Sequence, residues 1–151
     1  MPGRLDPSLA QPAVRVPSPE IVPAAVRQAA LEVFDLRLRG AVILDLIFDS
    51  AVDECAAEAG VRRLRFDARP SGVDVQIEVV LNALLPEVTR VQVWPARSVT
   101  VELRSPEGSE RFPTSTDGLA VTCLRPRGLV CFVLRSGDPD ERLLQSAWVR
   151  A

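Results

Sequence analysis

Apolar and polar residues alternate along most of the chain after Gly60. Residues 73–79 place an apolar side chain at every second position, and residues 99–103 repeat the pattern. A period of two is typical of half-buried antiparallel strands. Turn signals separate the runs, namely Ser71-Gly72, Ser105-Pro106-Glu107-Gly108, Asp117-Gly118 and Pro126-Arg127-Gly128. The spacing predicts about seven or eight short strands, which we expect to form a small antiparallel β-sandwich over residues 61–151.

One pair of these strands can be placed in register from its side chains. We expect the strands on either side of Ser71-Gly72 to pair directly across that turn. The pairs are then Leu64 with Val79, Phe66 with Ile77, Arg65 with Glu78 and Arg69 with Asp74. Apolar groups meet on one face and opposite charges on the other, and a slip of one residue would destroy both matches. The pattern therefore predicts a hairpin over residues 62–80.

The chain before Gly60 lacks this alternation and falls into two parts. Residues 1–18 contain four prolines without a period and are predicted to form a flexible leader. Residues 19–60 are predicted to be a helical segment. A helix start at Ser18-Pro19-Glu20 precedes apolar residues at helical spacing, which are Val26, Ala29, Ala30, Val33 and Phe34. We therefore expect a mainly-β protein of the α+β type, with its helices at the N-terminus.

Residues 42–48, with the sequence VILDLIF, form a strongly apolar run. Such a run fits either a buried strand or a helix that is apolar on nearly every side, and spacing alone does not separate the two. We favour the helix, in which Asp45 and Asp49 share one narrow polar stripe. The sequence that follows resembles a capping box for a further short helix within residues 50–59. A helix that is apolar all round needs cover from the β-domain, from a partner or from a second copy of the chain.

Composition removes several classes of chemistry. The chain has 151 residues, a net charge of −2 and a pI near 5.2, and all 18 of its basic residues are arginine. Lysine, histidine and tyrosine are absent, so the chain cannot supply a triad base, a histidine-ligated metal, a Schiff-base lysine or a Walker-type phosphate lysine. The acidic pI argues against general binding of nucleic acid. The preference for arginine over lysine resembles high-GC coding and hints at a bacterial origin.

The sequence also bears on the compartment and on the cysteines. No apolar run is long enough for a membrane-spanning helix, and residues 1–19 lack the apolar core of a secretory signal, so we expect a cytoplasmic protein that binds no membrane. In a reducing compartment Cys55, Cys123 and Cys131 are expected to be free, packed thiols. Cys123 and Cys131 flank the Pro126-Arg127-Gly128 turn, where a disulfide or redox switch across a hairpin is the alternative.

Two pairs of residues have both a chemical and a structural interpretation. Asp45 and Asp49 could serve as an acid–base or metal-binding pair, or they could line a solvated stripe. Trp94 and Trp148 could stack on a sugar, or they could cap the core at strand ends. We favour the structural interpretation for both pairs.

Two groups of charged residues also have both a chemical and a structural interpretation. An anion site and ordinary surface ion pairs are the alternatives for Arg62, Arg63, Arg65 and Arg69. Calcium binding and solvated charge are the alternatives for Asp67, Asp74 and Glu78. The hairpin register supplies partners for two of the arginines, and the acids lack the spacing of an EF-hand loop. We therefore assign no catalytic, cofactor-binding or metal-ligating residue.

Two stretches resemble a group of small actinobacterial proteins of the carboxypeptidase-regulatory-like kind. In the first stretch, residues 26–50, the matching residues are Phe34, Arg37, Leu46, Ile47, Phe48, Asp49 and Ser50. The second stretch begins with the RLRFD sequence of residues 63–67 and continues through Leu84-Leu85-Pro86, Thr116-Asp117-Gly118, Pro126-Arg127-Gly128 and Ala147-Trp148-Val149. The chain departs from the pattern at Gly40 and Val42, where the group prefers acids, and at Leu36, where it has tryptophan.

The resemblance implies a helical N-terminus joined to a transthyretin-like β-domain. Proteins of this group tend to be encoded beside alternative sigma factors and CHAT-domain proteases. The resemblance therefore implies an accessory or regulatory module that acts on a sigma factor or in a protease-linked signalling system.

Together these observations give the hypothesis of a non-catalytic, cytoplasmic protein-interaction module that needs no cofactor. The helical segment would make the contact, and its expected anchors are Phe34, Ile43, Leu46, Ile47 and Phe48. The partner is expected to be another protein, with a second copy of the chain as a further candidate. The alternative is a β-sandwich that binds a sugar or another small molecule in a pocket beside Trp94 or Trp148.

Overall fold

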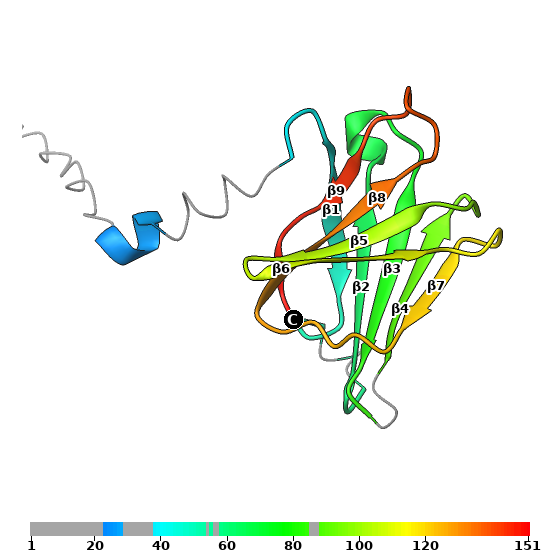
Figure 1. Cartoon of the computed structure of the whole chain (residues 1–151). Coiled ribbons are helices and arrows are strands. Elements are labelled where there is room, and N and C mark those ends of the chain that lie inside the picture. The colour runs from blue at the N-terminus through cyan, green and yellow to red at the C-terminus, as the bar shows by residue number, and fades with distance from the viewer. Residues whose placement is uncertain (1–22, 29–37, 54, 56–57, 85–87) are drawn as a thin grey trace, which may run out of the picture.

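The structure is a computed structural model that describes residues 23–28, 38–53, 55, 58–84 and 88–151. These residues form ten strands, a short 3-10 turn, η1 (Arg69–Ser71), and one helix over residues 24–28 (Figure 1). The strands are β1 (Val42–Asp49), β2 (Val61–Asp67), β3 (Gln76–Asn82), β4 (Val88–Trp94), β5 (Thr100–Ser105), β6 (Gly108–Pro113), β7 (Leu119–Thr122), β8 (Leu129–Arg135), β9 (Leu144–Ser146) and β10 (Val149–Arg150).

Nine of the strands form one path through a single sheet, in the order β6-β5-β8-β9-β1-β2-β3-β4-β7, and β10 pairs with β8 beside this path. The sheet curls through 289° and so nearly closes into a barrel (Figure 1). Neighbouring strands pair antiparallel along the path, except that β1 and β9 pair in parallel. The predicted antiparallel, transthyretin-like β-sandwich is therefore wrong, because a single mixed sheet takes the place of two packed sheets.

The difference arises at β1, which we expected to be a helix. Val42 and Leu44 point into the core, and the ladder to β9 runs over these first residues of the strand. The second half of β1 pairs with β2 instead. β1 therefore joins two halves of the sheet that a sandwich would keep apart. Its β-branched residues favour extended backbone, and Gly40, with a φ of 76°, turns the chain into it.

The prediction of a short helix within residues 50–59 is also wrong for the residues of this range that the structure describes. Residues 50–52 form a turn, and the Oδ1 atom of Asp49 accepts the backbone N–H of Ala51 at 2.9 Å. The Oγ atom of Ser50 accepts the backbone N–H of Arg63 on β2, also at 2.9 Å, so Ser50 does not cap a helix. The predicted leader and Phe34 lie outside the described residues.

Inward-facing side chains of the strands fill the inside of the barrel. The largest fully buried side chains of this core include Leu44, Leu64, Phe66, Ile77, Phe132 and Leu134. The rings of Phe66 on β2 and Phe132 on β8 lie with their centroids 6.4 Å apart, so the two halves of the sheet meet across the barrel axis. The interior of the described barrel is therefore packed core rather than an open binding cavity.

The predicted hairpin register is confirmed over β2 and β3. Leu64 pairs with Val79, and Phe66 with Ile77, in the ladder. Its outer end differs, because η1 follows β2 and the ladder stops at Asp67. Arg69 consequently binds Asp67, with 2.6 Å between Nη2 and Oδ2, instead of facing Asp74 across a tight turn.

The hairpin expected between Cys123 and Cys131 is absent from the described sheet. β7 pairs with β4, whereas β8 pairs with β5, β9 and β10. Cys131 is buried opposite Arg104 of β5, and Cys123 is exposed just after β7. Both thiols are free. Burial raises the pKa of Cys131 to about 12, so this thiol is unreactive at neutral pH.

Substitutions in β1 test whether it is a strand with one buried face. Leu44→Ala should lower the free energy of unfolding by about 2–5 kcal/mol, because it removes a fully buried side chain and leaves a cavity. Ile47→Ala, at a position that is 53% exposed, should change it by less than about 0.5 kcal/mol. Urea unfolding followed by circular dichroism measures both. Equal losses at the two positions would contradict the strand.

Candidate functional site

The most exposed apolar side chains of β1 lie at a bulge. The ladder to β2 shifts between Leu46, which pairs with Phe66, and Phe48, which pairs with Arg65, so Ile47 is the extra residue. The parallel ladder to β9 ends at Leu44, which leaves the second half of β1 without a strand on that side in the described sheet. Leu46 and Ile47 are consequently 39% and 53% exposed. Bulges commonly redirect side chains next to functional sites.

Neighbouring residues extend this exposed apolar area. Phe48 is half-buried, and the guanidinium of Arg65 lies 5.4 Å from the centre of its ring. Val52, in the turn after β1, is 80% exposed. We call the shallow depression formed by Leu46, Ile47, Phe48, Asp49, Val52 and Asp53 the β1 surface.

The predicted anchor residues therefore lie in different environments. Leu46 and Ile47 are exposed on the β1 surface, and Phe48 forms part of its wall. Ile43 is half-buried and pairs with Gln145 of β9, away from this surface. Phe34 lies outside the described residues. The role of all five in binding a partner stays a prediction.

The two aspartates of β1 do not form an acid–base pair. Arg62 holds Asp49 through two parallel bonds, with Nε 3.0 Å from Oδ1 and Nη2 2.7 Å from Oδ2. The hydrogen bond from Arg62 is the main reason that the pKa of Asp49 lies below its usual range. Arg62 also donates to the carbonyl oxygen of Arg150. Asp45 is exposed and lies opposite Asp67 in the ladder, on the other side of the bulge.

The arginines of β2 and η1 form ion pairs rather than an anion site. Arg63 lies 3.6 Å from Glu58, and Arg65 lies 2.9 Å from Glu78. Asp67 accepts hydrogen bonds from Arg69, and these bonds are the main reason that the pKa of Asp67 falls to about 2. Asp67 and Glu78, two of the three acids considered for calcium binding, are therefore already paired with arginines. Within the described residues, no group of three or more acids and cysteines is placed to hold a metal ion.

A second ionic cluster was not anticipated from the sequence. The carboxylate of Glu102 on β5 is only 4% exposed, and it lies on the outer face of the barrel beneath three arginines. Arg135 and Arg111 approach its Oε2 atom at 2.6 Å and 3.2 Å, and Arg104 lies 3.7 Å from Oε1. Burial raises the pKa of Glu102, but the bond from Arg135 and the charges of Arg135 and Arg111 outweigh it, so the pKa lies below its usual range. The sequence carries only an indirect signal for this cluster, because strand pairing brings these residues together.

The two tryptophans lie at or beside strand ends, apart from the apolar pocket at one end of the barrel. Trp94 ends β4 and is 44% exposed, and Trp148 is half-buried between β9 and β10. Neither lines the apolar pocket of about 340 Å³ at one end of the barrel, whose walls include Val61, Leu81, Val88 and Pro126. The polar groups at this pocket are bonded within the protein: Arg62 holds Asp49, and Thr89 donates to the carbonyl of Leu124 at 2.6 Å.

Comparisons with protein-family models, with curated proteins and with solved structures give no match for this chain. The fold therefore defines a class and nothing finer: a mainly-β protein with a single, barrel-like mixed sheet. Among the helical residues that the structure describes, no segment has the length and apolar character needed to cross a bilayer.

The Glu102 cluster makes stability depend on pH in a defined direction. A carboxyl with a lowered pKa stabilises the folded state above its ordinary pKa, and this contribution is lost as the pH falls. Glu102→Gln should therefore lower the free energy of unfolding by about 1–3 kcal/mol at pH 7, because three arginines lose their counter-charge. The difference from the parent should shrink as the pH falls below about 4.

Urea unfolding between pH 3 and pH 7 measures this difference. Glu110→Gln, at an exposed position on neighbouring β6, is the matched control and should have an effect below about 0.5 kcal/mol throughout. A Glu102→Gln effect that stays constant with pH would contradict the ionic role of this carboxylate.

Proposed function

We propose that the chain is a non-catalytic protein-interaction module and that its partner docks on the β1 surface. The observation that carries the proposal is the exposure of Leu46 and Ile47 at a bulge, with exposed Val52 and half-buried Phe48 lining the same shallow depression. Contiguous exposed apolar groups on a folded domain commonly mark a protein interface. Aliphatic and aromatic anchors at the centre of such an interface supply much of the binding energy.

The chemistry of the described charged groups supports a binding role over catalysis. Each carboxylate with a clearly lowered pKa is held by an arginine, as Asp49, Asp67 and Glu102 are. A general acid or base needs the opposite arrangement, in which the pKa moves toward neutrality. The chain also has no histidine to accept a proton near neutral pH.

The charges around the β1 surface indicate what the partner carries. Asp53 lies in the depression itself, and Asp45 is exposed on β1. Asp49 is already neutralised by Arg62. A partner that fits would insert an apolar side chain between basic residues. The resemblance to actinobacterial accessory proteins makes a sigma factor or a protease-linked signalling component the first partner to test.

The test compares partner capture by the parent chain and by Ile47→Asp. The substitution places a charge at the exposed bulge and should weaken capture of the partner at least tenfold without unfolding the barrel. Val121→Asp is the matched control, because Val121 is 59% exposed but lies on β7. The captured proteins are identified by mass spectrometry, and the affinity of each purified partner is then measured by titration.

The proposal requires a protein that is lost with Ile47→Asp and retained with Val121→Asp. Circular dichroism and thermal unfolding must show both variants folded. If every captured protein is retained by Ile47→Asp, the β1 surface is not the docking site. If the parent chain is a dimer that Ile47→Asp dissociates, a second copy covers this surface and the proposed heterologous partner is excluded.

A further inference from the structure

The arginines around Glu102 outnumber the carboxylate that they share. Arg104, Arg111 and Arg135 come from β5, β6 and β8, which are adjacent in the sheet, and their ion pairs converge on this one group. One negative charge among three positive ones leaves the cluster positive, although the chain as a whole has a net charge of −2. We call the patch of the outer face formed by these four residues the arginine surface.

Two of these arginines bond to Glu102 through Nε alone. The Nε atoms of Arg135 and Arg111 lie 2.6 Å and 3.2 Å from the same Oε2 atom. A guanidinium has five N–H donors, of which four belong to its two Nη groups. In the described part of the chain, Arg111 and Arg135 make no hydrogen bond through these Nη groups. Most of the donors of both side chains are therefore unused within the described barrel.

An arginine with a structural role binds differently in the same barrel. Arg62 holds Asp49 with Nε on one carboxylate oxygen and Nη2 on the other, at 3.0 Å and 2.7 Å. This guanidinium has a carboxylate of its own, whereas Arg111 and Arg135 share a single oxygen atom. The comparison indicates that the arginine surface holds more positive charge and more donors than the pairing of its strands requires.

The shared oxygen also holds the two guanidinium groups close together. Because both Nε atoms bond to Oε2 of Glu102, they cannot be further apart than the two bonds placed end to end. The ladder places Arg111 directly opposite Glu102, and the side chain of Ser109 gives this carboxylate a further hydrogen bond. Side chains that are already ordered lose less entropy when a partner binds. Two positive groups at this spacing also repel each other, so a second anion beside them is stabilising.

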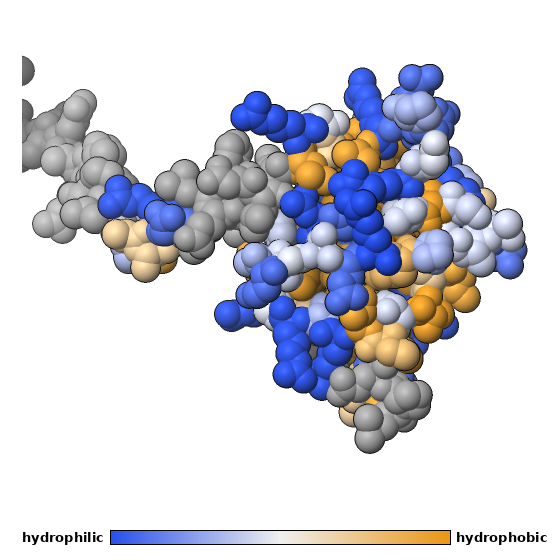
Figure 2. All heavy atoms as spheres, in the orientation of Figure 1, coloured by the Kyte–Doolittle hydropathy of each residue, from blue (hydrophilic) through white to orange (hydrophobic). Residues whose placement is uncertain are grey.

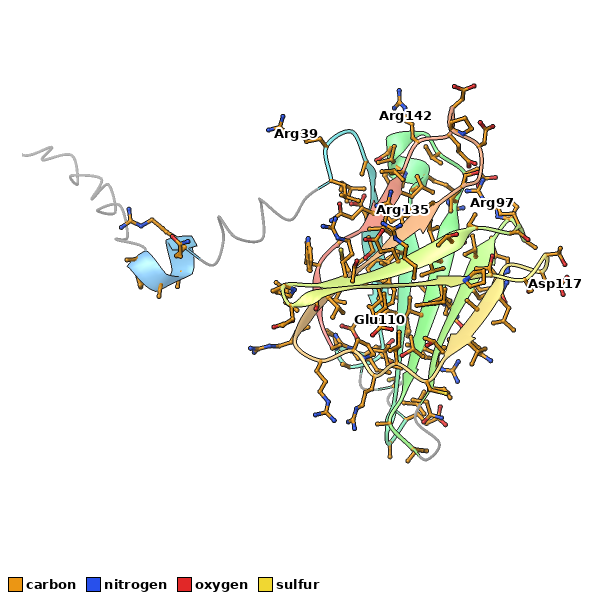
Figure 3. The ribbon with its side chains drawn as sticks, in the orientation of Figure 1. Arg39, Arg97, Glu110, Asp117, Arg135 and Arg142 are labelled. Carbon is orange, nitrogen blue, oxygen red and sulfur yellow. The ribbon has the colours of Figure 1, made fainter. Side chains whose placement is uncertain are left out.

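Both side chains are accessible on the outer face of the barrel. Those of Arg111 and Arg135 are 59% and 30% exposed. Figure 3 shows Arg135 on the face turned toward the viewer, and Figure 2 shows hydrophilic side chains gathered over β5 and β6 in the middle of that face. Glu110 precedes Arg111 in β6, so its side chain points to the other face of the strand, and Asp138 lies in the loop after β8. Among the described residues, neither acid forms an ion pair with the arginine surface.

The anion that suits this surface is a carboxylate. The planar edge of a guanidinium matches a carboxylate through two parallel N–H bonds. Phosphate sites commonly draw in addition on backbone N–H groups, at helix N-termini or in loops. The backbone of β5 is paired on both sides, with β6 and with β8, so its N–H groups are not offered to a ligand. The arginine surface therefore presents side-chain donors alone, which favours the carboxylates of a protein.

We propose that the arginine surface binds an acidic segment of a partner protein. One aspartate or glutamate carboxylate of the segment accepts hydrogen bonds from the Nη groups of Arg111 and Arg135. Glu102 is a positioning residue, which holds the two guanidinium groups from the protein side. The proposal is independent of the β1 surface, because it concerns other strands and a partner segment of opposite charge. Either proposal can therefore fail without the other.

The first measurement is a titration of the full chain with a hexaglutamate peptide, followed by NMR of the arginine side-chain N–H signals. The signals of Arg111 and Arg135 should shift, and a neutral hexaglutamine peptide should leave them unchanged. The affinity should fall as salt is added, because exposed charges are screened. Inorganic phosphate is the probe for the other kind of anion. It should displace the hexaglutamate peptide no more than sodium chloride of the same ionic strength does.

Variants of the chain then test the contact. Arg111→Gln should weaken binding of the hexaglutamate peptide at least tenfold, while Arg135 still pairs with Glu102 and keeps the barrel folded. Arg90→Gln is the matched control, because Arg90 is an exposed arginine on β4, and it should change the affinity less than twofold. Arg111→Lys keeps the charge but lacks the planar fork, so it should not restore the affinity of the parent.

Several results would overturn the proposal. Unshifted signals of Arg111 and Arg135 in the presence of the hexaglutamate peptide would show that no carboxylate binds there. Equal losses with Arg111→Gln and Arg90→Gln would show attraction to the overall charge rather than a site. Displacement by phosphate beyond the effect of ionic strength would assign the surface to phosphate. A dimer that Arg111→Gln dissociates would show that the acidic segment belongs to a second copy of the chain. Circular dichroism establishes that each variant is folded.

Discussion

The pairing of β1 with two different strands is the constraint on which the rest of the structure depends. Its first residues pair in parallel with β9, and its last residues pair antiparallel with β2. The strand thus passes from one half of the sheet to the other, and the inner face of this junction is closed by Val42 and Leu44. Because β9 ends where the ladder to β2 begins, no strand among the described residues covers the bulge at Ile47 on that side. The exposed β1 surface therefore follows directly from the way in which the barrel is assembled.

Local patterning predicted local structure well. The alternation of charged and apolar residues was sufficient to place Phe66 opposite Ile77, because register within a hairpin depends on neighbouring residues. The ion pairs of Arg62, Arg63, Arg65 and Arg69 were also anticipated, although η1 gave Arg69 a different partner. Leu46 and Ile47 were selected as surface anchors because they lay in an apolar run. They are exposed, but for a reason that requires the strand and its bulge.

The pairing of strands that are distant in the sequence could not be predicted in the same way. An apolar run such as residues 42–48 has neither a clear period of two nor a clear period of 3.6, so its conformation is decided by what covers it. Whether strands make a sandwich or a barrel depends on contacts between distant segments, here β1 with β9. The run of residues 129–134 also lacks a clear period, because both of its faces are buried. Phe132 faces the core, while Cys131 and Val133 are buried on the outer face. Glu102 was missed because three strands bring its arginines together.

The parallel contact between β1 and β9 also has a consequence for the order in which the chain can fold during synthesis. The hairpins of β2, β3 and β4 involve neighbours in sequence and can form as soon as they emerge from the ribosome. β1 emerges before them, but its β9 partner follows only after about a hundred further residues. Until β9 is made, the inward side chains of β1 lack the cover that β9 provides. The nascent barrel must therefore keep an apolar strand at its edge while most of the protein is still being made.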